Sequence, residues 1–224
     1  SASYTGYSVL DFNNPDLIAA YTMDNVSGSN VIDESPNGND AVNVGCTFEA
    51  GYIDDAATAQ VDGQQINTSA LDGMYTGDFS VSLWVNPADT LTSNRLLGCR
   101  NPGSASNIAF NVTVLQGGLV RVGGRESTSG SYQEWVITDA ALSANLWQNV
   151  IIVSSEGAIS VFINGVQSGT PANNITILSG VESAIFDEYQ SDPGTDTFIG
   201  KIDQFRVFNR GLAQEEITIL ANET

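Results

Sequence analysis

The 224-residue chain contains no histidine, and this absence removes several kinds of chemistry. Histidine is the commonest general base, and it activates the nucleophile in Ser-His-Asp and Cys-His arrangements. It is also a common ligand of zinc. The sequence therefore excludes those catalytic triads and any zinc site that uses histidine.

Cysteine is almost as scarce, since Cys46 and Cys99 are the only two. Two cysteines cannot build a disulfide-dense scaffold or a multi-cysteine zinc site. Their spacing does not place their β-carbons, so two states remain open. They either form one disulfide or stay reduced and buried.

Basic residues are few: 7 lysines and arginines stand against 26 acidic residues, which gives a net charge of −19. A nucleic acid or an anionic membrane surface would be repelled at long range. The acidic surplus suits divalent cations, high-salt surroundings or solubility alone. No apolar run reaches membrane-spanning length, and no leader pattern opens the chain, so we expect no nucleic-acid partner and no membrane insertion.

Apolar and polar residues alternate with period two along most of the chain, which is typical of half-buried strands. Residues 79–85 place Phe79, Val81, Leu83 and Val85 on one face. Asn164-Gly165, between two alternating runs, predicts a tight hairpin. Further strands are predicted at 17–21, 109–115, 119–122, 132–138, 148–154 and 197–208. Only residues 212–220 have helical spacing.

No linker or repeat divides the chain, and all-β sandwiches of this length form one domain. We therefore predict a single domain over residues 17–224. Residues 1–16 are weakly patterned. They form either an arm that docks on a neighbouring molecule or a covering strand on the same domain.

A series of landmarks, in order and spacing, resembles the laminin-G-like jelly rolls of the concanavalin A-like lectin/glucanase superfamily. Ala213 departs from the pattern, because the family usually has a Ser or Thr helix cap there. The landmarks cover residues 17 to 221 and comprise LIAAYTMD at 17–24, VIDESPNGNDA at 31–41, DFSVSLWVNP at 78–87, WQNV at 147–150, VFING at 161–165 and FIGKIDQFRVFNRGL at 198–212.

The resemblance implies an all-β sandwich of two antiparallel sheets with a short C-terminal helix. Members of the family hold glycans or proteins on a concave face or on rim loops, and some are glycoside hydrolases or polysaccharide lyases. Hydrolysis normally requires two facing carboxyl groups. The nearest acids, Glu182, Asp187 and Glu188, lie in a Gly/Ser-rich region, so we expect no enzyme.

An oxygen-rich turn at residues 33–40 carries Asp33, Asn37 and Asp40 among donors that calcium uses. Similar jelly rolls hold calcium here with an early Asp and an Asp of the closing strand. By resemblance these are Asp24 and Asp203. The alternative is an Asx-rich turn that bonds only its own backbone.

Glycan recognition stacks aromatic rings on sugars among polar side chains. Trp84 and Trp147 fit core packing better. Beside the Gly/Ser loop at 123–131, Tyr132 and Trp135 are better candidates for exposure, and Tyr189 is a further aromatic residue. The polar neighbours are Arg95, Arg100, Arg121 and Arg125.

The leading hypothesis is a non-catalytic binding or adhesion module for glycans or a protein surface, on the outside of a cell or virion and stabilised by calcium. The alternative is a structural subunit of a larger assembly, such as a virion decoration or appendage protein, and self-association fits either. The start at Ser1, the missing leader and the weakly patterned arm favour that alternative. A polysaccharide-active enzyme is third.

Overall fold

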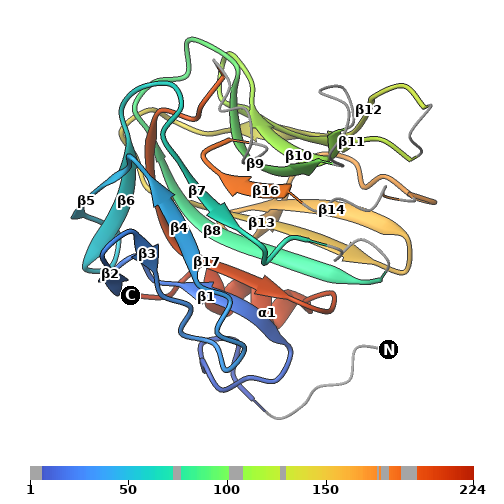
Figure 1. Cartoon of the computed structure of the whole chain (residues 1–224). Coiled ribbons are helices and arrows are strands. Elements are labelled where there is room, and N and C mark those ends of the chain that lie inside the picture. Colours follow the sequence, from blue (N-terminus) through green and yellow to red (C-terminus); the bar gives the residue numbers. More distant parts are fainter. Residues whose placement is uncertain are drawn as a thin grey trace.

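Alternating apolar residues build two antiparallel sheets that face each other, as the computed structural model in Figure 1 shows. The structure describes residues 7–72, 77–100, 108–126, 130–175, 177, 182–187 and 196–224. The predicted all-β sandwich with one short C-terminal helix is confirmed. Among the described residues, no helix is long and apolar enough to cross a membrane.

The first sheet has eight strands within the described ranges. Its order is β15 (Val166–Gln167), β14 (Ala158–Ile163), β13 (Gln148–Ser155), β8 (Phe79–Pro87), β17 (Gly200–Phe208), β6 (Asp55–Ala59) and β5 (Thr47–Ala50), and β1 (Leu17–Tyr21) also pairs with β17. We call it the eight-stranded sheet.

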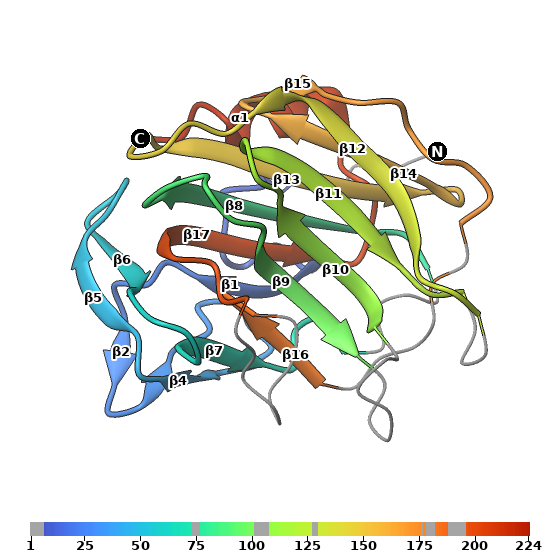
Figure 2. The same cartoon turned by 90° about the horizontal axis from the view of Figure 1, so that it is seen from above.

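The second sheet has nine described strands. Its order is β12 (Gln133–Ala141), β11 (Leu119–Gly124), β10 (Ile108–Val114), β9 (Asn94–Arg100), β16 (Glu182–Ile185), β7 (Gln65–Thr68), β4 (Ala41–Val44), β3 (Asn30–Val31) and β2 (Val26–Ser27). Seen from above in Figure 2, β9, β10 and β11 of this nine-stranded sheet lie in front of β8 and β17.

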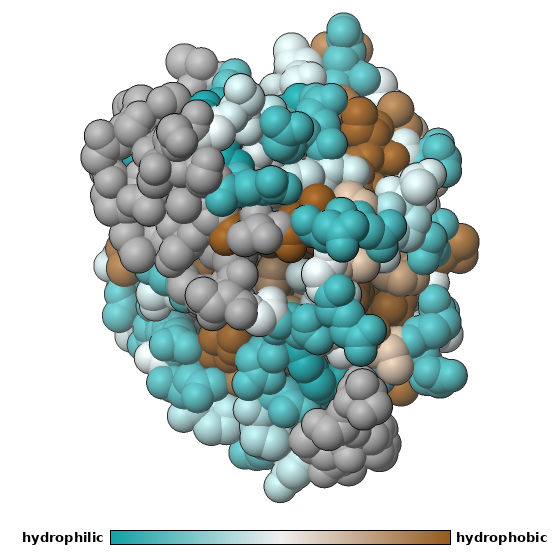
Figure 3. All heavy atoms as spheres, turned by 90° about the vertical axis from the view of Figure 1, so that its right-hand side faces the viewer, coloured by the Kyte–Doolittle hydropathy of each residue, from teal (hydrophilic) through white to brown (hydrophobic). Residues whose placement is uncertain are grey.

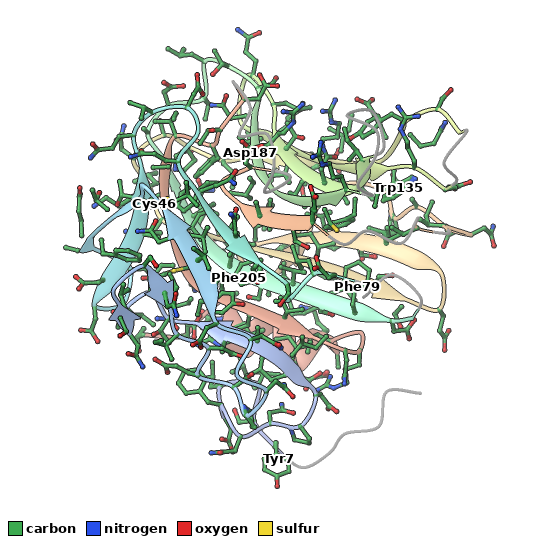
Figure 4. The ribbon with its side chains drawn as sticks, in the orientation of Figure 1. Tyr7, Cys46, Phe79, Trp135, Asp187 and Phe205 are labelled. Carbon is green, nitrogen blue, oxygen red and sulfur yellow. The ribbon has the colours of Figure 1, made fainter. Side chains whose placement is uncertain are left out.

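The core lies between the sheets and consists of the inward half of each alternating strand. Phe79, Val81, Leu83 and Val85 of β8 are all at most 1% exposed, which confirms the predicted face. Phe79 meets Phe110 of the opposite sheet edge to face, with ring centroids 5.6 Å apart. Figure 4 shows Phe79 and Phe205 in this interior.

The predicted hairpin is also present, because β14 pairs antiparallel with β15. Asn164 and Gly165 between them have φ values of 51° and 79°. Both residue types tolerate that left-handed conformation, which a two-residue hairpin turn requires.

The helix α1 (Gln214–Leu220) covers the outer face of the eight-stranded sheet and creates a second, smaller core. Glu216 compensates for the missing Ser or Thr cap, because its Oε2 accepts the backbone N–H of Ala213 at 2.9 Å. Val9 and Phe12 pack into the same core, so the described part of the N-terminal segment covers its own domain. This second core comprises Val9, Leu17, Ala20, Ile151, Val153, Phe162, Phe208, Leu212, Ile217 and Leu220.

Two sequence expectations change in detail. The closing strand begins at Gly200 and not at Thr197, which forms only an isolated bridge with Arg95. Cys46 and Cys99 do not form a disulfide with each other, and both belong to the main core. The reduced, buried state is therefore the one observed.

Most large apolar side chains on the surface come from separate elements, although β4 exposes both Val42 and Val44. Val61, Leu91 and Val166 are 59%, 71% and 69% exposed and lie far apart in the sequence. The face at the right of Figure 1 is largely hydrophilic among its coloured atoms, with hydrophobic groups between them (Figure 3). Singly exposed apolar residues of this kind are ordinary in water-soluble domains.

Replacing Phe110 by Ala should lower the free energy of unfolding by about 3–5 kcal/mol, because it leaves a cavity where the two sheets meet. Chemical denaturation measures this change. Ile137→Ala is the control, since Ile137 is 40% exposed and should change stability by only about 0.5 kcal/mol. Equal stability of the two variants would contradict the proposed role of Phe110.

Candidate functional site

The outward half of the nine-stranded sheet collects polar side chains on two neighbouring strands. Phe110 and Val112 of β10 face the core, so Asn111 and Thr113 face outward. The antiparallel register sets Asn111 opposite Gly123 and Thr113 opposite Arg121 on β11. Alternation and register together gather these four residues on one patch of the face.

A glycine pair allows aromatic rings to lie against both faces of β11. A Cβ on Gly123 would lie 2.8 Å from Cζ of Tyr132, and a Cβ on Gly124 would lie 2.6 Å from Cη2 of Trp135. Contacts this short do not occur at real β-carbons, so other residues would push the rings away. Tyr132 occupies the outer side with Gly123, and Trp135 packs against the core.

Tyr132 is held in place by contacts with Asn111 and Arg121. Its hydroxyl donates to Oδ1 of Asn111 at 2.8 Å, and the guanidinium carbon of Arg121 lies 5.4 Å from the ring centroid. Arg121 also pairs with Glu134 at 2.8 Å and contacts Thr113 Oγ1 at 3.4 Å. We call these five residues, Asn111, Thr113, Arg121, Tyr132 and Glu134, the tyrosine platform.

The tyrosine platform combines a buried base with an accessible rim. Asn111 and Thr113 are only 2% and 3% exposed, whereas Tyr132 and Arg121 are half-buried and Glu134 is exposed. Nε of Arg121 is buried without a hydrogen-bond partner among the described residues. The arrangement offers a fixed ring edge with both a cation and an anion beside it.

The structure separates the predicted ligand-binding residues. Tyr132 belongs to the tyrosine platform, but the Trp135 indole is half-buried against the core, because Gly124 leaves room for it there. Arg125 donates from Nη1 to the carbonyl of Gly130 within the β11–β12 connection. Tyr189 lies outside the described residues. Arg121 is one of the predicted polar neighbours, whereas Asn111, which completes the platform, becomes visible only through strand register.

The predicted acids are also separated. Glu182 at the start of β16 pairs with Arg100 at 3.0 Å, and Asp187 is fully buried. Glu188 lies outside the described residues. Asp72, which the sequence did not single out, accepts a hydrogen bond from the Ser183 hydroxyl. Burial raises the pKa of Asp72, and the charge of Glu182 contributes to that rise.

The five predicted metal ligands fall into two groups. In the first group, the Asp33 carboxylate accepts hydrogen bonds from the N–H groups of Ala20, Ser35 and Asn39 at 2.8–2.9 Å. Asp40 Oδ1 accepts the N–H of Asp33, and the Asn37 amide donates to the carbonyl of Leu17 at 2.7 Å. These side chains fix the turn to β1 in the manner of an Asx-rich turn.

Asp24 and Asp203 form the second group, beside the connection at 51–55. Asp203 is fully buried, and its carboxylate accepts the N–H groups of Tyr52, Ile53 and Gln204 at 2.7–2.9 Å. Burial raises the pKa of Asp203 to about 7, although the three N–H donors lower it, and the charge of Asp24 adds to the rise. Among the described residues, no group of three or more acidic or cysteine side chains is arranged to hold a metal ion.

The order of the two antiparallel sheets defines a β-sandwich, and comparison with known families gives the same fold class. The model of the concanavalin A-like lectin/glucanases superfamily, of the laminin-G type, matches residues 58–218. The chain belongs to this family. A search of curated proteins gives no match.

Solved structures with the same fold include carbohydrate-active and toxin domains. Domain 4 of the extracellular GH43 arabinanase AbnA from Geobacillus stearothermophilus, in complex with arabinotriose, is 24% identical, with a TM-score of 0.70 over 92% of this chain and 98% of that one. The binding domain of Paraclostridial Mosquitocidal Protein 1 is 18% identical, with a TM-score of 0.69 over 92% of this chain and 52% of that one. The Botulinum neurotoxin serotype G binding domain is 17% identical, with a TM-score of 0.66 over 92% and 50%.

Replacing Gly123 by Ala should displace Tyr132 from the platform and lower stability by about 1–3 kcal/mol, because the added methyl group overlaps the ring. Denaturant unfolding measures the loss. Gly77→Ala is the matched control, since a Cβ there meets no atom within 4 Å. If both variants unfolded at the same denaturant concentration, the packing argument would be wrong.

Proposed function

We propose that the protein is a non-catalytic module that binds carbohydrate at the tyrosine platform. The observation that carries the proposal is the fixed Tyr132 ring between Arg121 and Asn111. A sugar presents an apolar face and a rim of hydroxyl groups, and this site offers an aromatic ring beside charged and amide groups. Preorganisation by neighbours reduces the entropy that binding would cost.

The family and its solved relatives support the same assignment. The arabinanase domain binds arabinotriose, and two further similar domains are binding domains of toxins. The arabinanase is extracellular, which supports an extracellular location for this protein. We therefore propose a glycan on a cell or polymer surface as the partner. A protein surface is the alternative partner.

The absence of catalysis is part of the proposal. Glu182 pairs with Arg100 at 3.0 Å, and its charge contributes to the raised pKa of Asp72. A glycosidase needs one carboxyl group as proton donor and a second, free carboxylate facing it. An Arg-paired Glu182 is poorly suited to the second role.

Tyr132→Ala should weaken glycan binding by about tenfold or more, because loss of a central aromatic anchor typically removes about 2 kcal/mol or more. A glycan array identifies the ligand, and calorimetry measures its affinity. Gln133→Ala, at the exposed neighbouring position, should bind as the parent does. Release of reducing ends from a polysaccharide by the parent, if it were lost in Glu182→Gln, would contradict the absence of catalysis. An array on which no glycan binds would contradict the proposed carbohydrate binding.

We also propose that calcium stabilises the fold at Asp24 and Asp203. The donor set fits a hard cation, because one carboxylate is fully buried beside a second acid and its pKa is raised. A bound divalent ion would compensate both negative charges at once. Asp33, Asn37 and Asp40 are not part of this proposed site, since their polar groups hold the turn to β1.

Excess chelator should lower the melting temperature of the parent, because an ion bound only by the folded state stabilises it by mass action. Asp24→Asn should abolish this calcium-dependent shift, since it keeps an oxygen for the Asp55 N–H but loses the charge. Asp62→Asn, at an exposed acid, is the control and should retain the shift. A melting temperature that is identical with calcium and with chelator would rule the site out.

A further inference from the structure

A pocket of about 440 Å³ lies at one end of the eight-stranded sheet, away from the tyrosine platform. Strand register gathers its polar lining into one row on the outer face: Thr58 of β6 lies opposite Lys201 of β17, which in turn lies opposite Asn86 of β8. The row faces outward because the next residue of β17, Ile202, belongs to the core. The pocket is lined by Glu49, Thr58, Ala59, Gln60, Asn86, Ala88, Asn145, Ile199, Gly200 and Lys201.

The wall of the pocket is built by backbone that other residue types would not permit. Gly200 has a φ of 151°, and a Cβ there would lie 3.0 Å from Cα of Pro87. Asn145 adopts a left-handed φ of 60°, and its N–H donates to the carbonyl of Pro87 at 2.7 Å. These contacts hold the connection around Asn145 against the end of β8 and give the pocket a fixed shape.

The charges in the pocket compensate each other. Nζ of Lys201 lies 3.3 Å from Oε2 of Glu49 and donates to the carbonyl of Ala50 at 3.0 Å. Nε2 of Gln60 donates to the other oxygen of Glu49 at 3.3 Å. An anionic ligand would have to compete with Glu49 for Lys201, and the protein as a whole carries a charge of −19. A neutral ligand therefore fits best.

Thr58 supplies a hydrogen-bonding group that the described residues leave unused. Its side chain is 5% exposed, and its Oγ1 has no hydrogen-bond partner among them. A buried hydroxyl group without a hydrogen-bond partner is energetically unfavourable. A partner delivered from the pocket would remove that penalty.

Aromatic rings occupy the next row of the same face. Trp84 lies two residues before Asn86 on β8 and is opposite Asp203, while Tyr52 stacks on Trp84 with ring centroids 3.6 Å apart. The ring of Trp147, two residues after Asn145, lies 6.2 Å from that of Tyr52. The polar pocket therefore adjoins a cluster of three aromatic residues.

From this juxtaposition we infer that the pocket is a second binding site, which takes one neutral sugar residue of an oligosaccharide. The three amides of Gln60, Asn86 and Asn145 both donate and accept, as sugar hydroxyl groups do. The volume falls within the range of small-ligand pockets, and the polar lining disfavours an apolar ligand. The site lies on the opposite sheet from the tyrosine platform, so it does not depend on the first proposal.

Titration of the ¹⁵N-labelled full chain with arabinotriose, xylotriose, cellotriose and maltotriose tests the inference. We expect at least one of them to shift the backbone amides of Asn86, Asn145 and Lys201. Asn86→Ala should weaken that binding at least tenfold, and Ala88→Trp should block the pocket from its exposed rim. Thermal melting checks that both variants fold.

Arg121→Ala is the matched control, because it alters the tyrosine platform alone. Binding that is lost in Asn86→Ala and Ala88→Trp but kept in Arg121→Ala supports the pocket, whatever happens at the platform. Binding lost only in Arg121→Ala overturns the pocket and leaves the platform standing. The pocket proposal is also overturned if none of the four oligosaccharides shifts its amides.

Discussion

Packing of alternate side chains between two sheets is the constraint on which every other feature depends. Once Phe79 and Phe110 meet across the interface, the inward or outward direction of each neighbouring side chain along β8 and β10 is fixed. A slip of one residue would turn Asn111 and Ser80 toward the interior, away from their hydrogen-bond partners Tyr132 and Arg210, and would move core side chains to the outer faces. Both candidate surfaces therefore follow from the interior packing, because they consist of the side chains that alternate with the core residues and face outward.

The closing strand β17 connects most of the remaining features. Its outward residues include Lys201 in the pocket, Asp203 beside Asp24, and Arg206, which pairs with Glu223 at 2.9 Å. The pairing with β8 shifts register between Asp203 and Arg206, where Gln204 has a φ of 49°. Just before this bulge, the Asp203 carboxylate accepts the backbone N–H groups of Tyr52 and Ile53. A buried carboxylate is tolerated there because those donors surround it.

Two binding surfaces on opposite sheets would suit a module that attaches to an extended or repetitive ligand. Weak sites on one molecule raise the overall affinity through effective concentration when both can be occupied together. The strong negative charge fits this role, since neutral sugars are not repelled, whereas nucleic acids are. Recognition on this domain would then rest on hydroxyl and ring contacts and not on ion pairing.

The sequence alone determined the fold class, the hairpin at Asn164-Gly165, the inward face of β8 and the terminal helix, because each depends on local periodicity or turn chemistry. It also identified Tyr132 as a candidate for exposure and linked Asp24 with Asp203 through a family resemblance. It left open the state of the two cysteines, which the interior keeps apart. It grouped Asp33, Asn37 and Asp40 with Asp203, although their hydrogen bonds serve a different turn.

Only the tertiary structure decided which side chains meet across strands. Tyr132 and Trp135 look alike in sequence, yet Gly123 and Gly124 direct them to opposite faces of one sheet. The pocket unites Glu49, Asn86, Asn145 and Lys201, which are separated by up to about 150 positions in the chain. Such contacts depend on strand order and register, and neither is encoded in the alternation of any single strand.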